Sequence, residues 1–205
     1  FLAGGPGSGK SWVSARTLMG QGMKVINSDD GFERYAKNAG LNLKKMGSFT
    51  AAQTKKKDAL RSRAKVGTAY MHQHAIDGRL GMILDSTARD TARIESEAQS
   101  MRYLGYDTYM VFVNTTLEVA LKRNEMRPRS VPEPIVINSH RQIQKNIPKL
   151  RAIFGSKNFV EVDNSVEAED VNIKVYKEIQ KLVRSKPSSP MAQAWINNEL
   201  AKKRR

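Results

Sequence analysis

The feature that most constrains this chain is a phosphate-binding loop that begins at its fourth residue. Residues 4–11 read G-G-P-G-S-G-K-S and match the pattern G-x-x-x-x-G-K-[ST]. The apolar residues 1–3 lead directly into the loop, and Val13 and Leu18 follow it at helical spacing. Such a loop leaves a buried strand and opens a helix, so that successive backbone N–H groups converge on a polyphosphate. The sequence therefore predicts an α/β fold with a nucleotide site. The simpler alternative is a glycine-rich surface turn with a chance lysine.

The loop residues divide the work of holding a nucleotide. The glycines allow the backbone to turn and to approach phosphates without a Cβ in the way. Lys10 can reach the outer phosphates, and the Ser11 hydroxyl can coordinate Mg²⁺. The residues predicted to bind the nucleotide here are Gly5, Gly7, Ser8, Gly9, Lys10 and Ser11.

Five short apolar stretches, separated by helical patterns, are predicted to be strands. They are residues 1–3, 23–26, 80–84, 109–113 and 159–162. Right-handed crossovers and a central nucleotide site require the first strand to lie inside the sheet. We therefore expect a five-stranded parallel sheet in the order 2-3-1-4-5, with helices on both faces. The first helix should stop near Met19 and Gly20, since glycines follow its apolar pattern.

Polar residues follow several of these strands at the point where each one ends. The segments are residues 27–30 (Asn-Ser-Asp-Asp), 85–87 (Asp-Ser-Thr) and 114–116 (Asn-Thr-Thr). Ligands of parallel sheets bind beyond the carboxyl ends of the strands, which is also where the loop lies. The sequence therefore places the site at this edge.

Two adjacent carboxylates, Asp29 and Asp30, follow the second predicted strand. A carboxylate there could accept the proton of an attacking hydroxyl during phosphate transfer. Alternatively, an Asp could cap a helix that starts near Gly31, so that one of the pair caps while the other catalyses. Asp85 ends the next strand along the chain and is a candidate to hold the water shell of Mg²⁺. Ser86 follows it in place of a water-orienting Glu, which favours a transferase over a hydrolase.

A lid that closes over the phosphates is predicted for residues 122–134. This segment combines a helix end, a proline-rich turn and three arginines, Arg123, Arg127 and Arg129. Arginines delivered over the phosphates would neutralise charge that develops during transfer, while the lid excludes water. An ordinary basic surface loop is the alternative.

The chain is strongly basic. Its 205 residues carry a formal net charge of +15, which favours polyanionic partners. Lys57, Arg61 and Lys65 would form one stripe on a helix, either to track a substrate backbone or as a solvated face. There is no cysteine, which fits a reducing cytoplasmic setting, and no apolar run is long enough for a membrane span. We expect one kinase-like domain over 1–186, with its first strand truncated, and a basic linker and helix over 187–205.

Taken together, the loop, the segment 25–30, the segment 83–87 and the lid motif K-R-N-x-x-R resemble the kinase domain of phage 5′-polynucleotide kinases. The related zeta-toxin kinases share the loop and the general layout. The resemblance covers residues 1–154. It implies that ATP and Mg²⁺ are used, that Asp29 is the general base and that Arg127 contacts the β- and γ-phosphates.

The same resemblance implies roles for further residues. Arg123 would lie near the nucleotide and Asp85 near the acceptor. The acceptor-binding candidates are Asp30, Arg34, Asp85 and Thr87. In the polynucleotide kinases an arginine follows the catalytic Asp by three positions, whereas Arg34 follows Asp29 by five.

Three functions remain open from the sequence. The first is an ATP-dependent kinase of a nucleic acid 5′-hydroxyl, which the basic charge favours. The second is a kinase of a small hydroxylated metabolite such as a nucleotide sugar, and the third is a non-catalytic ATP-binding protein. The expected location is the cytoplasm, that of the host if the chain is phage-encoded.

Overall fold

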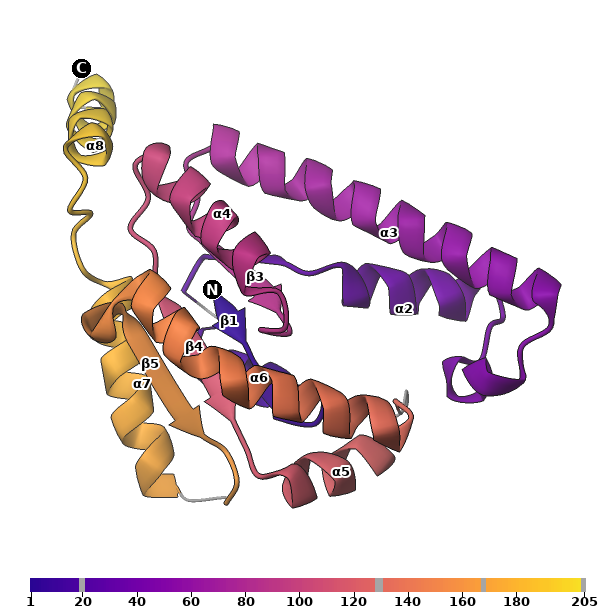
Figure 1. Ribbon diagram of the computed structural model, residues 1–205. Helices are drawn as coiled ribbons and strands as arrows, with labels where there is room; N and C mark the ends of the chain where they lie inside the picture. The colour runs from indigo at the N-terminus through magenta and orange to yellow at the C-terminus, as the bar shows by residue number, and fades with distance from the viewer. Residues whose placement is uncertain (19–20, 128–130, 167–168, 204–205) are drawn as a thin grey trace.

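The computed structural model describes residues 1–18, 21–127, 131–166 and 169–203. At its centre lies a parallel sheet with helices on both faces (Figure 1). The five strands stand in the order β2-β3-β1-β4-β5, as predicted, and each predicted stretch overlaps one of them. Their bounds are β1 Leu2–Ala3, β2 Lys24–Ile26, β3 Met82–Ser86, β4 Met110–Asn114 and β5 Phe159–Asp163.

The helices are α1 Lys10–Thr17, α2 Ser28–Asn38, α3 Ala51–Asp77, α4 Thr91–Tyr103, α5 Leu117–Glu125, α6 Glu133–Phe154, α7 Glu169–Val183 and α8 Pro190–Lys203. Short 3₁₀ turns occur at η1 Leu43–Ser48 and η2 Ser156–Asn158. Helix α1 ends at Thr17, and the stop predicted at Met19 and Gly20 lies outside the described residues. No described helix is long and apolar enough to cross a membrane.

The alternation of side chains along the central strands builds two cores. Val111 and Val113 of β4 point into a cluster that α1 and α7 cover, whereas Met110 and Phe112 point into a cluster that α4 and α6 cover. Successive side chains of a strand face opposite sides of a sheet, so a continuously apolar strand must be covered on both. This explains why β4 is buried along almost its whole length.

Helices α2 and α3 form an arm, residues 28–77, that projects from the edge of the sheet where β2 lies (Figure 1). The arm has a small core of its own, in which Phe32 and Ala36 of α2 pack near Ala64 of α3. Helix α3 starts with a reciprocal capping box, since the Thr50 hydroxyl accepts from the Gln53 N–H and the Gln53 side chain accepts from the Thr50 N–H. This arm carries one wall of the site.

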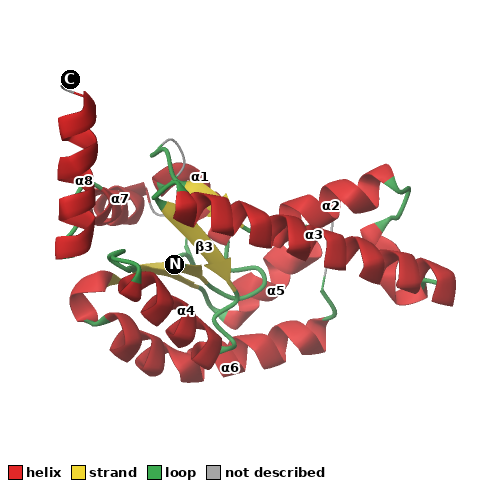
Figure 2. Cartoon of the chain, turned by 90° about the horizontal axis from the view of Figure 1, so that it is seen from above, coloured by secondary structure: helices red, strands yellow, loops and turns green. Residues whose placement is uncertain are grey.

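Helix α8 stands away from the sheet, at the far end of a linker (Figures 1 and 2). None of the described residues of α8 is buried, although Trp195 and Ile196 line a pocket together with Tyr106 of the domain. The linker itself is fixed, because the backbone N–H of Ser188 donates to Asp107 Oδ2 at 2.7 Å. The linker and the start of α8 therefore hold this helix beside Gly105, where a Cβ would lie 3.5 Å from Met191 Sδ.

Candidate active site

The phosphate-binding loop has the shape that its glycines predict. Gly7 and Gly9 have φ angles of 77° and 86°, in the left-handed region that favours glycine. A Cβ at Gly7 would lie 2.2 Å from the Ala120 carbonyl oxygen of α5, and one at Gly9 would lie 2.2 Å from Asn164 Nδ2. The loop is therefore wedged between α5 and the segment after β5, and a larger residue would break this packing.

Two polar side chains of this loop, those of Lys10 and Ser8, have contacts that fit phosphate binding. The Lys10 ammonium donates to the Gly4 carbonyl at 2.8 Å, which holds the charge over the loop. The Ser8 side chain is buried, and its hydroxyl has no hydrogen-bond partner among the described residues. A buried hydroxyl of this kind needs a partner, and a bound phosphate oxygen would supply one.

Arg123 reaches the loop through a residue that sequence reasoning missed. Its Nη1 donates to the Asn164 carbonyl at 2.7 Å, and Asn164 Nδ2 donates to the Ser8 carbonyl at 2.8 Å. Asn164 follows β5 at the carboxyl edge of the sheet, where polar residues also follow the other strands. This position in the sequence could have identified Asn164 as a candidate site residue. Arg123 thus lies beside the loop, as expected of a residue near the nucleotide.

A second residue to which the sequence assigned no role, Asn124, connects the two sides of the predicted lid. This buried side chain donates through Nδ2 to the Val131 carbonyl at 2.7 Å and accepts from the Val131 N–H at 3.0 Å. The pair ties the start of α6 to the end of α5 across the predicted lid. Arg127 is exposed just before the turn, and the predicted lid arginine Arg129 lies outside the described residues.

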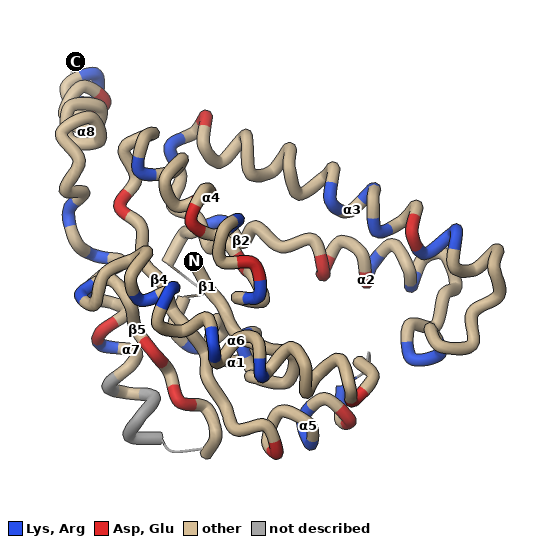
Figure 3. The backbone as a smooth tube through the Cα atoms, viewed as in Figure 1, with Lys and Arg blue, Asp and Glu red and all other residues tan. Residues whose placement is uncertain are grey.

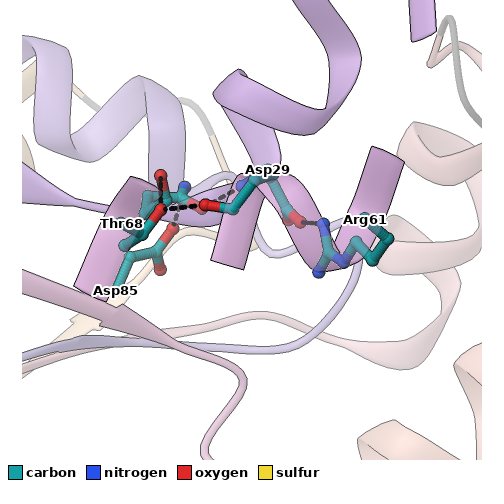
Figure 4. A network of polar contacts seen from close by, with 6 residues as sticks. Asp29, Arg61, Thr68 and Asp85 are labelled. Carbon is teal, nitrogen blue, oxygen red and sulfur yellow. Dashed lines mark hydrogen bonds and ion pairs between the residues drawn. The ribbon is translucent and has the colours of Figure 1, made fainter. Parts of the chain in front are cut away.

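The ends of β2 and β3 are joined by a polar network (Figure 4). Asn27 Nδ2 donates to Asp85 Oδ2 at 2.7 Å, and Asn27 Oδ1 accepts from the Asp29 N–H at 2.7 Å. Asn27 is thus the N-cap of α2, which begins at Ser28. The interpretation of Asp29 as a helix cap is therefore wrong, because Asn27 already fills that place and leaves the Asp29 carboxylate for other contacts.

Asp85 is a partly buried carboxylate, and one of its two oxygens accepts no hydrogen bond from the described residues. Burial raises the pKa of Asp85, and the Lys10 ammonium opposes the shift, while Asp29 and Asp30 add to it. Its Oδ1 is buried without a hydrogen-bond partner among the described residues. Mg²⁺ in phosphate sites is usually held through one or two carboxylates, water and the substrate phosphates, so this oxygen fits that role. The described residues hold no group of three His, Cys, Asp or Glu that could bind a metal by itself.

The pKa of Lys10 shows that the predicted site residues share one electrostatic environment. Burial lowers the pKa of this ammonium group, the Asp85 carboxylate raises it, Arg127 lowers it and Asp29 raises it. These side chains come from the loop, β3, α2 and the end of α5. The fold thus brings Lys10, Asp85, Asp29 and Arg127 near one another, which their separation in the sequence does not imply.

The partner of Asp29 is Arg61, from the middle of α3. Arg61 Nη1 lies 2.5 Å from Asp29 Oδ1 (Figure 4). The Arg61 guanidinium also lies over the Phe32 ring, 5.1 Å from its centroid. Both side chains are about a third exposed, at 35% and 41%. The sequence had assigned Arg61 to a backbone-tracking stripe, and only the packing of α3 on α2 shows its contact with the candidate base.

The remaining candidates lie at the margin of this group. Asp30 is exposed in the first turn of α2, and Thr87 is exposed after β3. Arg34 is also exposed, one turn along α2, with its guanidinium 5.7 Å from the Tyr35 ring centroid. Arg61, rather than Arg34, is the arginine that contacts Asp29.

Comparison with solved structures finds several proteins to which the chain is similar. A candidate kinase from Chloroflexus aurantiacus J-10-fl has 12% identity and a TM-score of 0.54, covering 87% of this chain and 95% of its own. A gluconokinase from Sinorhizobium meliloti 1021 has 15% identity and a TM-score of 0.49, covering 89% and 91%. A shikimate kinase from Acinetobacter baumannii, in complex with shikimate, has 16% identity and a TM-score of 0.40, covering 89% and 90%. The first likeness shows the same fold.

No curated protein matches the sequence. The model of the zeta toxin family, in contrast, matches residues 1–186, which include the loop, the polar network and the lid. The kinship with zeta-toxin kinases is thereby confirmed, while the closer likeness to phage polynucleotide kinases stays a prediction. We conclude that the chain belongs to the zeta toxin family and is a kinase.

Proposed function

We propose that the protein transfers the γ-phosphate of ATP to a hydroxyl group, with Asp29 as the general base. The observation that carries this proposal is the convergence of Asp29, Asp85 and Lys10 at the carboxyl edge of the sheet. The acceptor oxygen forms a bond to the γ-phosphorus, and the bond from that phosphorus to the β–γ bridging oxygen breaks. The hydroxyl proton passes to Asp29, and ADP leaves.

The side chains around the phosphates share the remaining work. Lys10 and the loop N–H groups bind the phosphates, and Arg127 places a cation beside Lys10 at the end of α5. Ser11 and Asp85 would hold Mg²⁺, which supplies positive charge for the phosphate oxygens. Arg61 holds Asp29 Oδ1 at a fixed place, which orients the carboxylate for its role toward the acceptor hydroxyl.

The acceptor that we propose first is a nucleic acid 5′-hydroxyl, because the arm that carries Asp29 is strongly basic. Between residues 43 and 66 there are eight Lys and Arg against Asp58 alone. The second candidate is a small hydroxylated metabolite such as a nucleotide sugar. Membership in the zeta toxin family favours this second candidate.

Two substitutions should separate binding from catalysis. Lys10→Ala removes a phosphate contact and should weaken both ATP binding and turnover. Asp29→Asn keeps the shape but removes the base, so ATP should bind with unchanged Kd while transfer falls about a hundredfold or more. Asp77→Asn, an exposed carboxylate at the far end of α3, is the matched control and should retain transfer. A fully active Asp29→Asn would mean that Asp30 or Asp85 is the base.

The acceptor is tested with labelled ATP against a 5′-hydroxyl oligonucleotide and, separately, a panel of nucleotide sugars. Label on the oligonucleotide supports the first candidate. Label on the sugars alone would replace it with the second. ATP binding without transfer to either set would leave a nucleotide-binding protein as the remaining function.

A further inference from the structure

The arm formed by α2 and α3 concentrates the positive charge of the molecule. Lys and Arg gather along the outer half of α3 and at η1, where the arm extends farthest from the sheet (Figure 3). The contributing residues are Lys44, Lys45, Lys55, Lys56, Lys57, Arg61, Arg63 and Lys65. Some of this charge is used within the arm, because Lys56 donates to the Ala39 carbonyl and Arg63 stacks over Tyr35.

Three of these residues form a row along one side of α3. Lys57, Arg61 and Lys65 are each four residues apart, so they lie nearly above one another on the helix. The contact of Arg61 with Asp29 shows which way the row faces: it lies on the side of α3 that looks toward the site. The row therefore continues the wall that carries the candidate base.

The length of the row indicates whether its ligand is a small anion or a polymer. Lys57 and Lys65 are separated by about 12 Å along the helix, at 1.5 Å per residue. Two adjacent phosphates of a nucleoside diphosphate cannot reach both ends of such a row. A phosphate backbone can, and a single row of cations on one helix suits one strand.

The row stays accessible at both ends. Lys65 is exposed, and the side chain of Lys57 is 29% exposed beside Asp58, which lies 3.0 Å away on the solvent side with 64% exposure. A pair as exposed as this one contributes little, so Lys57 can exchange Asp58 for a phosphate at low cost.

We propose that Lys57, Arg61 and Lys65 form a binding surface for single-stranded nucleic acid, which leads the strand past Asp29. The binding itself is independent of phosphate transfer. Only the statement that the strand carries the reacting hydroxyl rests on the proposed function.

The test measures binding of a fluorescent 15-nucleotide oligothymidine to the full chain without ATP, between 50 and 200 mM salt. Each phosphate contact on a single strand contributes about 0.7 to the slope of log affinity against log salt. The double variant Lys57→Gln/Lys65→Gln should therefore reduce the slope by about 1.4. Over this fourfold salt range, the wild type should lose about sevenfold more affinity than the variant. Arg61 is kept, because it contacts Asp29.

The matched control is Lys177→Gln/Lys181→Gln, which removes the same charge from exposed positions of α7. An equal change of slope in both double variants would overturn the proposal, because general charge would then explain the binding. Vesicles with anionic lipid provide the other comparison. If binding to the vesicles depends on Lys57 and Lys65 while binding to the oligonucleotide does not, the surface is a membrane contact and the proposal fails.

Lys10→Ala separates this proposal from the proposed function. This variant lacks the phosphate contact and should bind the oligonucleotide as the wild type does. If no variant or acceptor shows transfer but the slopes differ as stated, the surface stands and the kinase proposal falls. If transfer to sugars occurs and the slopes do not differ, the kinase proposal stands and the surface falls.

Discussion

At the scale of single residues, the site keeps a carboxylate in a place that disfavours its charge. Burial raises the pKa of Asp85 above its ordinary value of 3.8, although Lys10 opposes the shift. A group whose pKa is raised by folding stabilises the fold below its unfolded pKa, and that contribution is lost as the pH rises through the folded pKa. Ionisation of Asp85 therefore costs stability as the pH rises through the raised pKa, and a role toward Mg²⁺ would explain why a carboxylate stands there.

Asp85→Asn should accordingly stabilise the protein while it abolishes transfer. The amide oxygen can still accept from Asn27, and the buried charge is gone. The free energy of unfolding at pH 7, measured by urea denaturation, should exceed that of the wild type. The difference should shrink as the pH falls toward 3.8. Asp30→Asn controls for the loss of one negative charge. An Asp85→Asn protein less stable than the wild type at pH 7 would contradict this account.

At the scale of elements, α5 and α6 are joined across the predicted lid by one buried side chain. Asn124 makes two hydrogen bonds to the backbone of Val131, and together these bonds hold the two ends of the turn. A buried side-chain amide that bonds both the N–H and the carbonyl of one backbone residue holds a loop more tightly than exposed contacts do. If Arg123 and Arg127 contact the phosphates as predicted, their positions should depend on this anchor.

Asn124→Ala should loosen the lid and admit water to the phosphates. We expect transfer to the acceptor to fall at least tenfold, while ATP hydrolysis without acceptor rises relative to transfer. The measurement compares ADP release with labelled acceptor. Thr116→Ala is the matched control, since it removes the N-cap of the same helix and costs about 1 kcal/mol without touching the lid. The same ratio of hydrolysis to transfer in both variants would rule out a specific role of Asn124.

At the scale of the whole molecule, the described structure divides into a packed domain and a helix outside it. The two main cores lie on the faces of the sheet and are complete at α7, where Ile179 is 1% exposed. Helix α8 adds no buried residue, and Trp195 on its apolar side is 40% exposed. Stability follows buried apolar area, so it should belong to the domain and not to α8.

A chain that ends at Lys186 should therefore fold and bind ATP as the full chain does. We expect Tm to change by less than about 2 °C, because none of the described residues of α8 is buried and the Ser188–Asp107 hydrogen bonds that are lost are exposed. Ile179→Ala is the matched comparison, since a buried Ile replaced by Ala costs about 2–5 kcal/mol. The measurement is the Tm of both proteins in thermal unfolding. A drop in Tm after truncation as large as that of Ile179→Ala would mean that α8 packs on the domain.

The sequence by itself determined the elements and their order. The loop pattern, the apolar strands and the polar residues after them are local signals, because periodicity and turn chemistry act over a few residues. They were sufficient for the strand order 2-3-1-4-5 and the edge where the site lies. The zeta-toxin kinship is confirmed for the same reason, since the family match covers these segments.

The tertiary structure alone decided which side chains meet. Arg61 reaches Asp29 across 32 positions, and Asn164 reaches Ser8 across 156. No local pattern encodes such pairs, because they depend on how α3 packs on α2 and how β5 ends beside the loop. Asn27 caps the helix for which an Asp had been the candidate, and α8 buries none of its described residues. Local sequence patterns determine where helices and strands form, whereas contacts between side chains far apart in the sequence form only when those helices and strands pack together.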